Sequence, residues 1–286
     1  MIWLFAGIGL YLLALFGIAL FSLHPIRTPH FISPGLLGTP QEEIEIVSTK
    51  GVNLKCWWVD AGPRSNATAI LCHGYVMNRS ELTPVAHWLW QRGISSLLVE
   101  FRAHGKSGGG VTTIGVREAD DVVAAVAEAR RRRPGTRTLL IGSSMGSAAC
   151  AFAAGQGVDA DAIVLDSCYS RLIRASFGWW RFLGNRAVSI VLGPSVFFAG
   201  PLAGINPFKV DVAKALESTT CPVLILHGRC DDLAEPCEAE RNLAALGGRG
   251  EIVWFEGCGH SEFRWQQPEL YYRELEAFLR RTGFLD

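Results

Sequence analysis

The sequence predicts an α/β protein with a mostly parallel central sheet of about eight strands, helices on both faces and a transmembrane helix at the N-terminus. The sheet is predicted by an alternation of short apolar runs, typical of strands buried on both faces, with longer amphipathic stretches, typical of helices. The transmembrane helix is predicted by an uncharged stretch from Met1 to Leu23. A length of 286 residues could hold one large α/β domain or two smaller ones.

The overall composition excludes several classes of function. Lysine and arginine number 27, as do aspartate and glutamate, so the basic surplus of a nucleic-acid-binding protein is missing. Hydrophobic residues make up 49% of the chain and charged residues 19%, which is too apolar for a disordered chain. The eight cysteines include no Cys-x-x-Cys pair, which argues against zinc-ribbon and thioredoxin-like sites. No nucleic-acid partner and no metal site are therefore expected.

Residues 1–23 are expected to form a single-pass membrane anchor. At ~1.5 Å of rise per residue, about 20 residues cover the ~30 Å hydrocarbon core. The alternatives are a buried core helix and a cleaved signal peptide. A signal peptide would have a cationic start, a short apolar core and a small-x-small cleavage site, and none of these is present. Arg27 is the only strong cation near either end, so the side of the membrane on which the rest of the chain lies stays open.

The following segment, residues 24–41, contains four prolines and is expected to be an irregular linker. From residue 42 to residue 286 the alternation of strands and helices predicts one domain. Its first two strands surround Lys50-Gly51 and are expected to pair antiparallel. Strands are predicted at residues 43–49, 53–60, 67–72, 96–101, 138–141, 162–165, 223–226 and 252–255, and helices at 80–91, 118–132, 145–154, 239–245 and 268–281.

Residues 142–146 read Gly-Ser-Ser-Met-Gly and match the pattern Gly-x-Ser-x-Gly between a predicted strand and a predicted helix. This is the context of a nucleophile elbow, a sharp turn whose small flanking residues let a serine hydroxyl stand above the sheet. The positive end of the new helix also lies beside that hydroxyl. Ser144 is therefore the candidate nucleophile, and the alternative is a glycine-rich turn without chemistry.

A serine hydroxyl needs a general base within hydrogen-bond distance at neutral pH. Among seven histidines, His260 follows the last strand and comes after every candidate acid, which satisfies the order nucleophile, acid, base. The small residues Gly257-Cys258-Gly259 leave room for its imidazole to reach Ser144. The other histidines are expected in the linker (His24 and His30), in a helix (His87) and in loops that they help to shape (His73, His104 and His227).

The acid that orients the base is expected after the strand that ends at Leu226. Asp231 is the preferred candidate and Asp232 the second, because both follow that strand within a few residues. Asp166, at the end of an earlier strand, is a remote third candidate.

Two backbone N–H groups are expected to stabilise the negative charge that develops on an acyl oxygen. One belongs to Met145, directly after the candidate nucleophile, and the other to Tyr75, in the loop after the strand at residues 67–72. Loss of one such donor typically costs about 3–4 kcal/mol of transition-state stabilisation.

With these motifs in place, residues 43–278 resemble the α/β-hydrolase superfamily, and more narrowly its membrane-anchored, serine-aminopeptidase-like and ABHD-type branch. The resemblance implies hydrolysis of ester, thioester or amide bonds without a cofactor. Glu100 and Ala103 depart from the aspartate and glycine usual in the family. One extra residue between Asp231 and Pro236 leaves the choice between Asp231 and Asp232 open. The matching segments are residues 71–75, 100–107, 112–115, 142–146, 166–167, 227–232 and 259–260.

The segment between the strands at residues 162–165 and 223–226 is longer than one crossover helix needs, so about residues 167–211 are expected to form a cap. From Ser167 to Phe208 its only charged residues are four arginines, among many aromatic residues. Two compatible interpretations are a lid over an acyl pocket and a basic, aromatic surface that touches anionic lipid near the anchor. The residues expected to line the pocket are Phe177, Trp179, Trp180 and Phe182.

Cys230 and Cys258 flank the candidate acid and base and could approach each other, although buried free thiols are the default expectation. Together these observations predict a single-pass membrane-anchored serine hydrolase that cleaves ester or thioester bonds of apolar acyl substrates, including lipids, through an acyl-enzyme. The alternatives are a serine peptidase and a membrane-bound binding module without turnover. The physiological substrate, the acyl chain length and the oligomeric state stay open.

Overall fold

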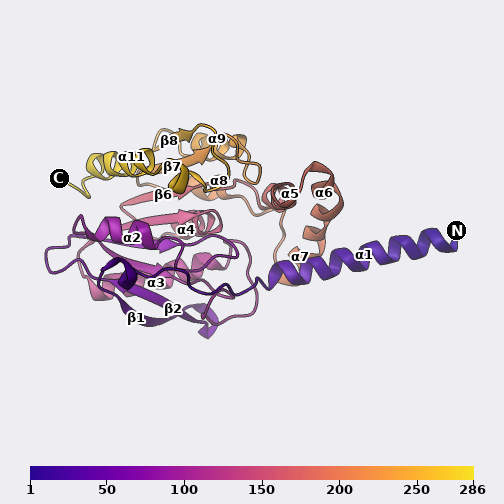
Figure 1. Cartoon of the computed structure of the whole chain (residues 1–286), viewed down its shortest axis with the longest axis horizontal. Coiled ribbons are helices and arrows are strands. Elements are labelled where there is room, and N and C mark those ends of the chain that lie inside the picture. Colours follow the sequence, from indigo (N-terminus) through magenta and orange to yellow (C-terminus); the bar gives the residue numbers. More distant parts are fainter.

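The computed structural model describes residues 1–286 and has one central sheet (Figure 1). Its eight strands lie in the order β1-β2-β4-β3-β5-β6-β7-β8. β2 pairs antiparallel with both β1 and β4, and all other neighbouring strands pair parallel, which confirms the predicted mostly parallel sheet with an antiparallel entry pair. The strands are β1 (Glu42–Val47), β2 (Asn53–Val59), β3 (Ala67–Cys72), β4 (Ser95–Val99), β5 (Arg137–Ser143), β6 (Ala162–Asp166), β7 (Val223–Gly228) and β8 (Gly250–Phe255).

Helices cover both faces of the sheet, as predicted. Successive side chains of a strand point to opposite faces, so each face carries apolar side chains that pack with helices into a separate core. In β3, for example, Ile70 packs into one core and Leu71 into the other. Helices α2 (Thr83–Trp90) and α11 (Pro268–Arg281) lie on one face, and α3 (Glu118–Arg132), α4 (Met145–Gly155), α8 (Val212–Leu216) and α9 (Pro236–Ala245) lie on the other.

Two predicted helix starts were wrong, and in both cases a proline explains the difference. The helix predicted from Ser80 begins at Thr83, with Pro84 in its first turn, where a missing N–H costs nothing. The helix predicted from Ala239 begins at Pro236 for the same reason. The short helix α10 (Phe263–Gln266) was not predicted.

The uncharged N-terminal segment forms one continuous helix, α1 (Ile2–Leu23), which projects from the body of the molecule (Figure 1). Its first thirteen residues are exposed, and only Leu15, Ala19 and Leu23, which share one face, are buried. By length and composition α1 can cross a membrane, and a signal sequence would pass the same test. The helical stretch Arg186–Ala203 also passes it.

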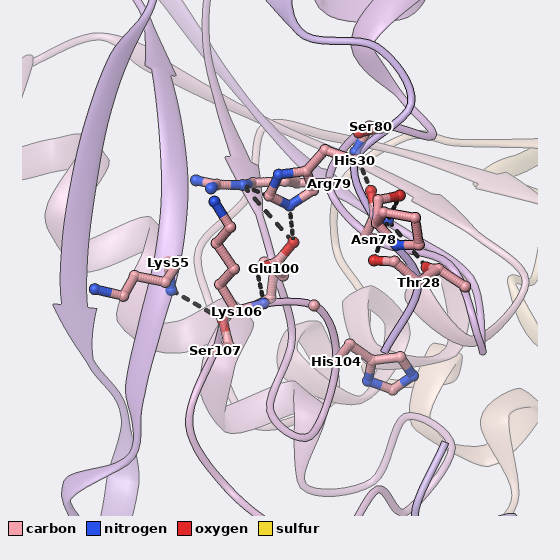
Figure 2. A network of polar contacts seen from close by, with 12 residues as sticks. Thr28, His30, Lys55, Asn78, Arg79, Ser80, Glu100, His104, Lys106 and Ser107 are labelled. Carbon is pink, nitrogen blue, oxygen red and sulfur yellow. Dashed lines mark hydrogen bonds and ion pairs between the residues drawn. The ribbon is translucent and has the colours of Figure 1, made fainter. Parts of the chain in front are cut away.

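The expected linker, residues 24–41, is irregular apart from the 3-10 turn Pro34–Leu37, but it is bonded firmly to the body (Figure 2). The Arg27 guanidinium donates hydrogen bonds to the backbone carbonyls of Gly105, Ser107 and Gly109 at 2.6–3.0 Å. Further along, His30 Nε2 lies 2.6 Å from the buried Glu100 carboxylate. These bonds fix the end of α1 relative to the sheet.

The predicted cap insert contains α5 (Leu172–Leu183), α6 (Arg186–Leu192), the 3-10 turn η3 (Gly193–Ser195) and α7 (Val196–Ala203). Its two ends meet at a bridge between Arg171 and Asp211, next to a hydrogen bond from Leu172 N–H to the Val210 carbonyl. From this base the cap extends alongside the C-terminal part of α1 (Figure 1).

Candidate active site

The turn between β5 and α4 has the geometry expected of a nucleophile elbow. Ser144 adopts φ 50° and ψ −110°, a conformation that side chains rarely take and that small neighbours make possible. A Cβ at Gly146 would collide with the carbonyl of Cys72, and one at Gly142 with the backbone of Gly146. Both glycines of the motif are therefore required by close backbone approach.

The structure brings the three predicted side chains together at the carboxyl ends of the strands, where ligands bind in sheets of this type. His260 Nε2 lies 2.8 Å from Ser144 Oγ, and His260 Nδ1 lies 2.8 Å from Asp231 Oδ2. One tautomer satisfies both contacts, with Nδ1–H donating to the carboxylate and the Ser144 hydroxyl donating to Nε2. The imidazole is thus positioned to accept the serine proton.

Asp231, and not Asp232, contacts the imidazole. Its second oxygen, Oδ1, accepts hydrogen bonds from the backbone N–H groups of Leu233 and Ala234 at 2.9 and 2.8 Å, which fix the carboxylate. His227 Nε2 donates to the Ala234 carbonyl at 2.7 Å and holds the same loop, in agreement with the loop-shaping role expected of it. The Asp232 side chain makes no hydrogen bond within the protein and is exposed.

The electrostatic surroundings of His260 favour its protonated form. Burial would lower the pKa of the imidazole, but the charge and hydrogen bond of Asp231, with the charges of Asp166 and Glu81, raise that pKa above its ordinary value. A base with a raised pKa accepts a proton from serine more readily.

The loop that follows β3 presents a candidate donor to the same site. The N–H groups of Tyr75 and Met145, the two expected oxyanion donors, make no hydrogen bond within the protein. His73, two residues before Tyr75, is buried, and burial lowers its pKa to about 3, so its ring is neutral. The neutral ring accepts from Phe101 N–H at 3.0 Å and donates to the Gly74 carbonyl at 2.7 Å, which shapes the loop as expected.

A buried ionic cluster behind the nucleophile was missed by the sequence analysis. The Glu81 carboxylate accepts from Gly74 N–H at 2.7 Å, from Ser143 Oγ at 2.6 Å and from the Arg264 guanidinium at 2.5 Å. Burial would raise the pKa of Glu81, but the charge of Arg264 and these hydrogen bonds lower it, so the group stays ionised. Glu81 therefore fixes the residue that precedes Tyr75.

Asp166, the remote third candidate for the acid, belongs to this cluster and not to the contact with His260. Its Oδ2 lies 3.2 Å from Arg264 Nε, and its Oδ1 accepts from Ser261 Oγ at 2.9 Å. Burial, opposed by Arg264, raises the pKa of Asp166.

A cavity of about 400 Å³ opens above Ser144, between the cap and the sheet. Trp179, Trp180 and Phe182 line it, as expected, and the Phe182 ring lies 6.2 Å from the His260 ring. The expectation for Phe177 was wrong: it packs against Gly193 and the Phe197 ring instead. Two residues from Trp179, a helix has turned by roughly 200°, so Phe177 faces away from the cavity.

The end of α1 forms part of the cavity wall through Ser22 and Leu23. Tyr75 connects this wall to the candidate oxyanion loop, because its hydroxyl donates to the Ser22 carbonyl at 2.9 Å. The Tyr75 ring also lies edge-on to Trp179 of the cap, at 5.1 Å between centroids. One residue therefore contacts the anchor, the cap and the site.

Three of the four cap arginines are in ion pairs with acidic residues of the body or of the cap's own base, and they do not form a free basic surface. Arg174 pairs with Glu235 and Glu238, Arg181 with Glu235, and Arg171 with Asp211; Arg186 is exposed.

All eight cysteines are free. Cys230 N–H donates to the Cys258 carbonyl at 2.9 Å, so the two segments do approach each other as expected, without a disulfide. No group of three or more His, Cys, Asp or Glu side chains converges as a metal site.

Sequence comparisons match this chain to hydrolases and to uncharacterized relatives. A family model described as serine aminopeptidase, S33, matches residues 63–191, which include the elbow and Tyr75 but neither Asp231 nor His260. The uncharacterized protein YfhR of Escherichia coli is 27% identical over 202 residues, which make up 66% of this chain and 63% of YfhR. The uncharacterized protein YqkD of Bacillus subtilis is 26% identical over 245 residues, 82% of this chain and 77% of YqkD.

Solved structures resemble a larger part of the chain. The Pyrococcus furiosus esterase Pf2001 superposes with a TM-score of 0.77 at 26% identity, over 91% of this chain and 98% of the esterase. The acylaminoacyl peptidase of Pyrococcus horikoshii superposes with a TM-score of 0.68 at 15% identity, over 87% of this chain and 43% of the peptidase. At 15% identity, the likeness to the acylaminoacyl peptidase shows a shared fold and nothing more.

Proposed function

We propose that this protein is a serine hydrolase with the α/β-hydrolase fold and that α1 anchors it to a membrane. We propose further that it cleaves ester or thioester bonds of apolar acyl substrates. The observation that supports this most strongly is the hydrogen-bonded chain from Asp231 through His260 to Ser144.

The reaction would proceed through an acyl-enzyme on Ser144. As the Ser144 oxygen attacks the acyl carbon, His260 takes the hydroxyl proton, and Asp231 stabilises the imidazolium without itself being protonated. The N–H groups of Tyr75 and Met145 donate to the acyl oxygen as it becomes negative. His260 then gives its proton to the leaving group, and a water molecule deprotonated by the same imidazole releases the acid.

The lining of the cavity supports an apolar acyl group. The cavity above Ser144 lies within the ~300–1,000 Å³ range of small-molecule sites, and its walls include Trp179, Phe182 and Val196. Each buried methylene contributes about 0.8 kcal/mol. We therefore expect kcat/KM for p-nitrophenyl esters to rise with chain length until the cavity is filled.

Labelling of the full-length protein with a fluorophosphonate probe tests the proposal directly. Wild-type protein and the Ser143→Ala variant should both be labelled. The Ser143 hydroxyl donates to Glu81 and takes no part in the hydrogen bonds that join Asp231, His260 and Ser144. Ser144→Ala should not be labelled. If correctly folded wild-type protein is not labelled, the chain is better described as a binding module without turnover.

A serine peptidase is the second candidate, favoured by the description of the matching family model and by the exposed Glu262, which lines the cavity and could hold a peptide's terminal ammonium group. The two candidates differ in the preferred bond. Faster cleavage of aminoacyl anilides than of p-nitrophenyl esters of matched size would replace the esterase assignment.

A further inference from the structure

The outer surface of the cap is apolar and lies beside α1. Between Arg186 and Lys209 the chain has no charged residue, and both of these flanking cations are exposed. Ile190, Val191, Phe197, Leu202 and Phe208, all within this stretch, are large apolar side chains that the body does not cover. Large apolar side chains that are exposed together on one segment, and not scattered singly over the molecule, mark an interaction site.

The cap lies alongside the half of α1 that is nearest the body (Figure 1). α1 packs against α7, with Leu15, Ala19 and Leu23 buried on one face of α1, and the Phe16 ring lies 6.1 Å from the Phe198 ring, edge to face. Further along α1, the Tyr11 hydroxyl donates to the Val191 carbonyl at 2.7 Å. The cap therefore lies beside α1 from the last turn of α1 back to about the level of Tyr11.

The rise of an α-helix gives the distance along α1 over which the cap lies beside it. At ~1.5 Å per residue, Leu15 lies about 12 Å and Tyr11 about 18 Å from Leu23 along the axis. One leaflet contributes roughly half of the ~30 Å hydrocarbon core, which is about 15 Å. If α1 spans the bilayer, the cap beside it is as deep as one leaflet.

We propose that α6, η3 and α7 are embedded in the leaflet nearest the catalytic domain, beside α1, and that the substrate is a membrane lipid which reaches Ser144 directly from that leaflet. This inference rests on the proposed function for its substrate and on α1 as a membrane span for its depth. The partner that fits this apolar cap surface is the lipid bilayer. The cap surface continues the surface of α1, an uncharged helix long enough to span a membrane, and cations flank the cap stretch only at its two ends.

The same stretch does not form a second crossing. Before it, the Phe182 ring contacts the His260 ring, and after it, the Val210 carbonyl accepts from Leu172 N–H. Both ends therefore return to the catalytic domain, on one side of the membrane. Gly193 and Pro194 interrupt the helical stretch between α6 and α7, as is typical of a segment that enters and leaves a membrane on one side.

The cavity adjoins this embedded part of the molecule. Ser22 and Leu23 of α1 line it from one side, and Ser195, Val196 and Ala199 of the cap line it from the other. An acyl chain could therefore pass from the leaflet to Ser144 along apolar walls without crossing water. Transfer through water would cost about 0.8 kcal/mol for each methylene exposed.

A photoactivatable lipid tests the position of the cap independently of catalysis. Full-length protein is reconstituted in phosphatidylcholine vesicles that contain phosphatidylcholine with a diazirine in the acyl chain, and the labelled peptides are identified by mass spectrometry. We expect label in residues 187–208 as well as in residues 2–23, and none around Leu36, an apolar residue exposed on the linker. Label in residues 2–23 alone, or cross-links between two copies through the cap, would overturn the proposal.

A charge on the cap surface tests the route of the substrate. Ile190→Lys places a cation at a side chain that is 72% exposed and does not line the cavity, and Leu36→Lys is the matched control at 76%. Ile190→Lys should lower hydrolysis of a long-chain ester embedded in vesicles by roughly fivefold or more, while hydrolysis of water-soluble p-nitrophenyl acetate stays unchanged. Leu36→Lys should change neither rate.

An equal loss on both substrates, or an equal effect of the two variants, would contradict the proposed route. If wild-type protein hydrolyses neither ester and the fluorophosphonate probe does not label it, the proposed function fails. The lipid-labelling result still decides the position of the cap in that case.

Discussion

Replacing Asp231 with asparagine removes the negative charge beside His260 while keeping a side chain of the same shape. The asparagine oxygen can still accept from Leu233 and Ala234, so the loop should keep its structure. The amide can then present an N–H to His260, which favours the tautomer that cannot accept the serine proton. The loss in kcat should be roughly ten-thousandfold, the scale known for removal of a charge that orients a catalytic imidazole.

The Asp231→Asn substitution should also shift the pH dependence of kcat/KM. Asp231 raises the pKa of His260 above its ordinary value of 6.5, and only the neutral imidazole acts as a base. In the wild type, kcat/KM should therefore increase with pH through a pKa above 6.5, and in Asp231→Asn this limb should move to lower pH. The assay is hydrolysis of a p-nitrophenyl ester between pH 5 and 9.

Asp232→Asn is the matched control, because the Asp232 side chain makes no hydrogen bond within the protein; its rate and pH profile should stay close to those of the wild type. A large loss in Asp232→Asn, or a wild-type rate retained in Asp231→Asn, would refute the assignment of the acid.

Three further changes test other parts of the structure. Gly146→Ala should lower the free energy of unfolding by about 2 kcal/mol or more in urea titration, because its Cβ would collide with the Cys72 carbonyl; unchanged stability would contradict the elbow geometry. Glu81→Gln should lower kcat roughly tenfold with little change in KM, because Gly74 loses a charged acceptor; unchanged steady-state kinetics would limit Glu81 to a structural role. Arg27→Ala should speed hydrogen exchange in residues 105–109 by roughly tenfold or more, because it removes hydrogen bonds to three carbonyls of that loop; unchanged exchange would show that the linker does not hold it.

The sheet and the elbow could be predicted because their signals are local. The alternation of apolar runs fixes strands without knowledge of their neighbours, and Gly142 and Gly146 are required by a turn that spans five residues. The order of Ser144, an acid and His260 follows from the connectivity of the sheet. Sequence reasoning left the choice between Asp231 and Asp232 open because it depends on the path of one loop.

The ionic cluster behind Ser144 could not be predicted, because Glu81, Asp166 and Arg264 come from separate parts of the chain and each alone is typical of an exposed helix or loop end. The attachment of the linker was missed for a related reason. Its prolines predict irregular backbone, but they do not show that Arg27 donates hydrogen bonds to four carbonyls some eighty residues away. Phe177 was misplaced because the apolar residues of α5 do not reveal which of its faces is turned to the cavity.

The hydrogen bond between the Tyr75 hydroxyl and the Ser22 carbonyl bears on how this protein should be purified. Trimming the first 23 residues for solubility would remove the acceptor of that bond and two residues of the cavity wall. Rates measured on such a shortened form would describe an enzyme with a different opening and a looser loop at residue 75. Detergent micelles or nanodiscs that keep the whole chain are the preparations in which its chemistry can be compared with its structure.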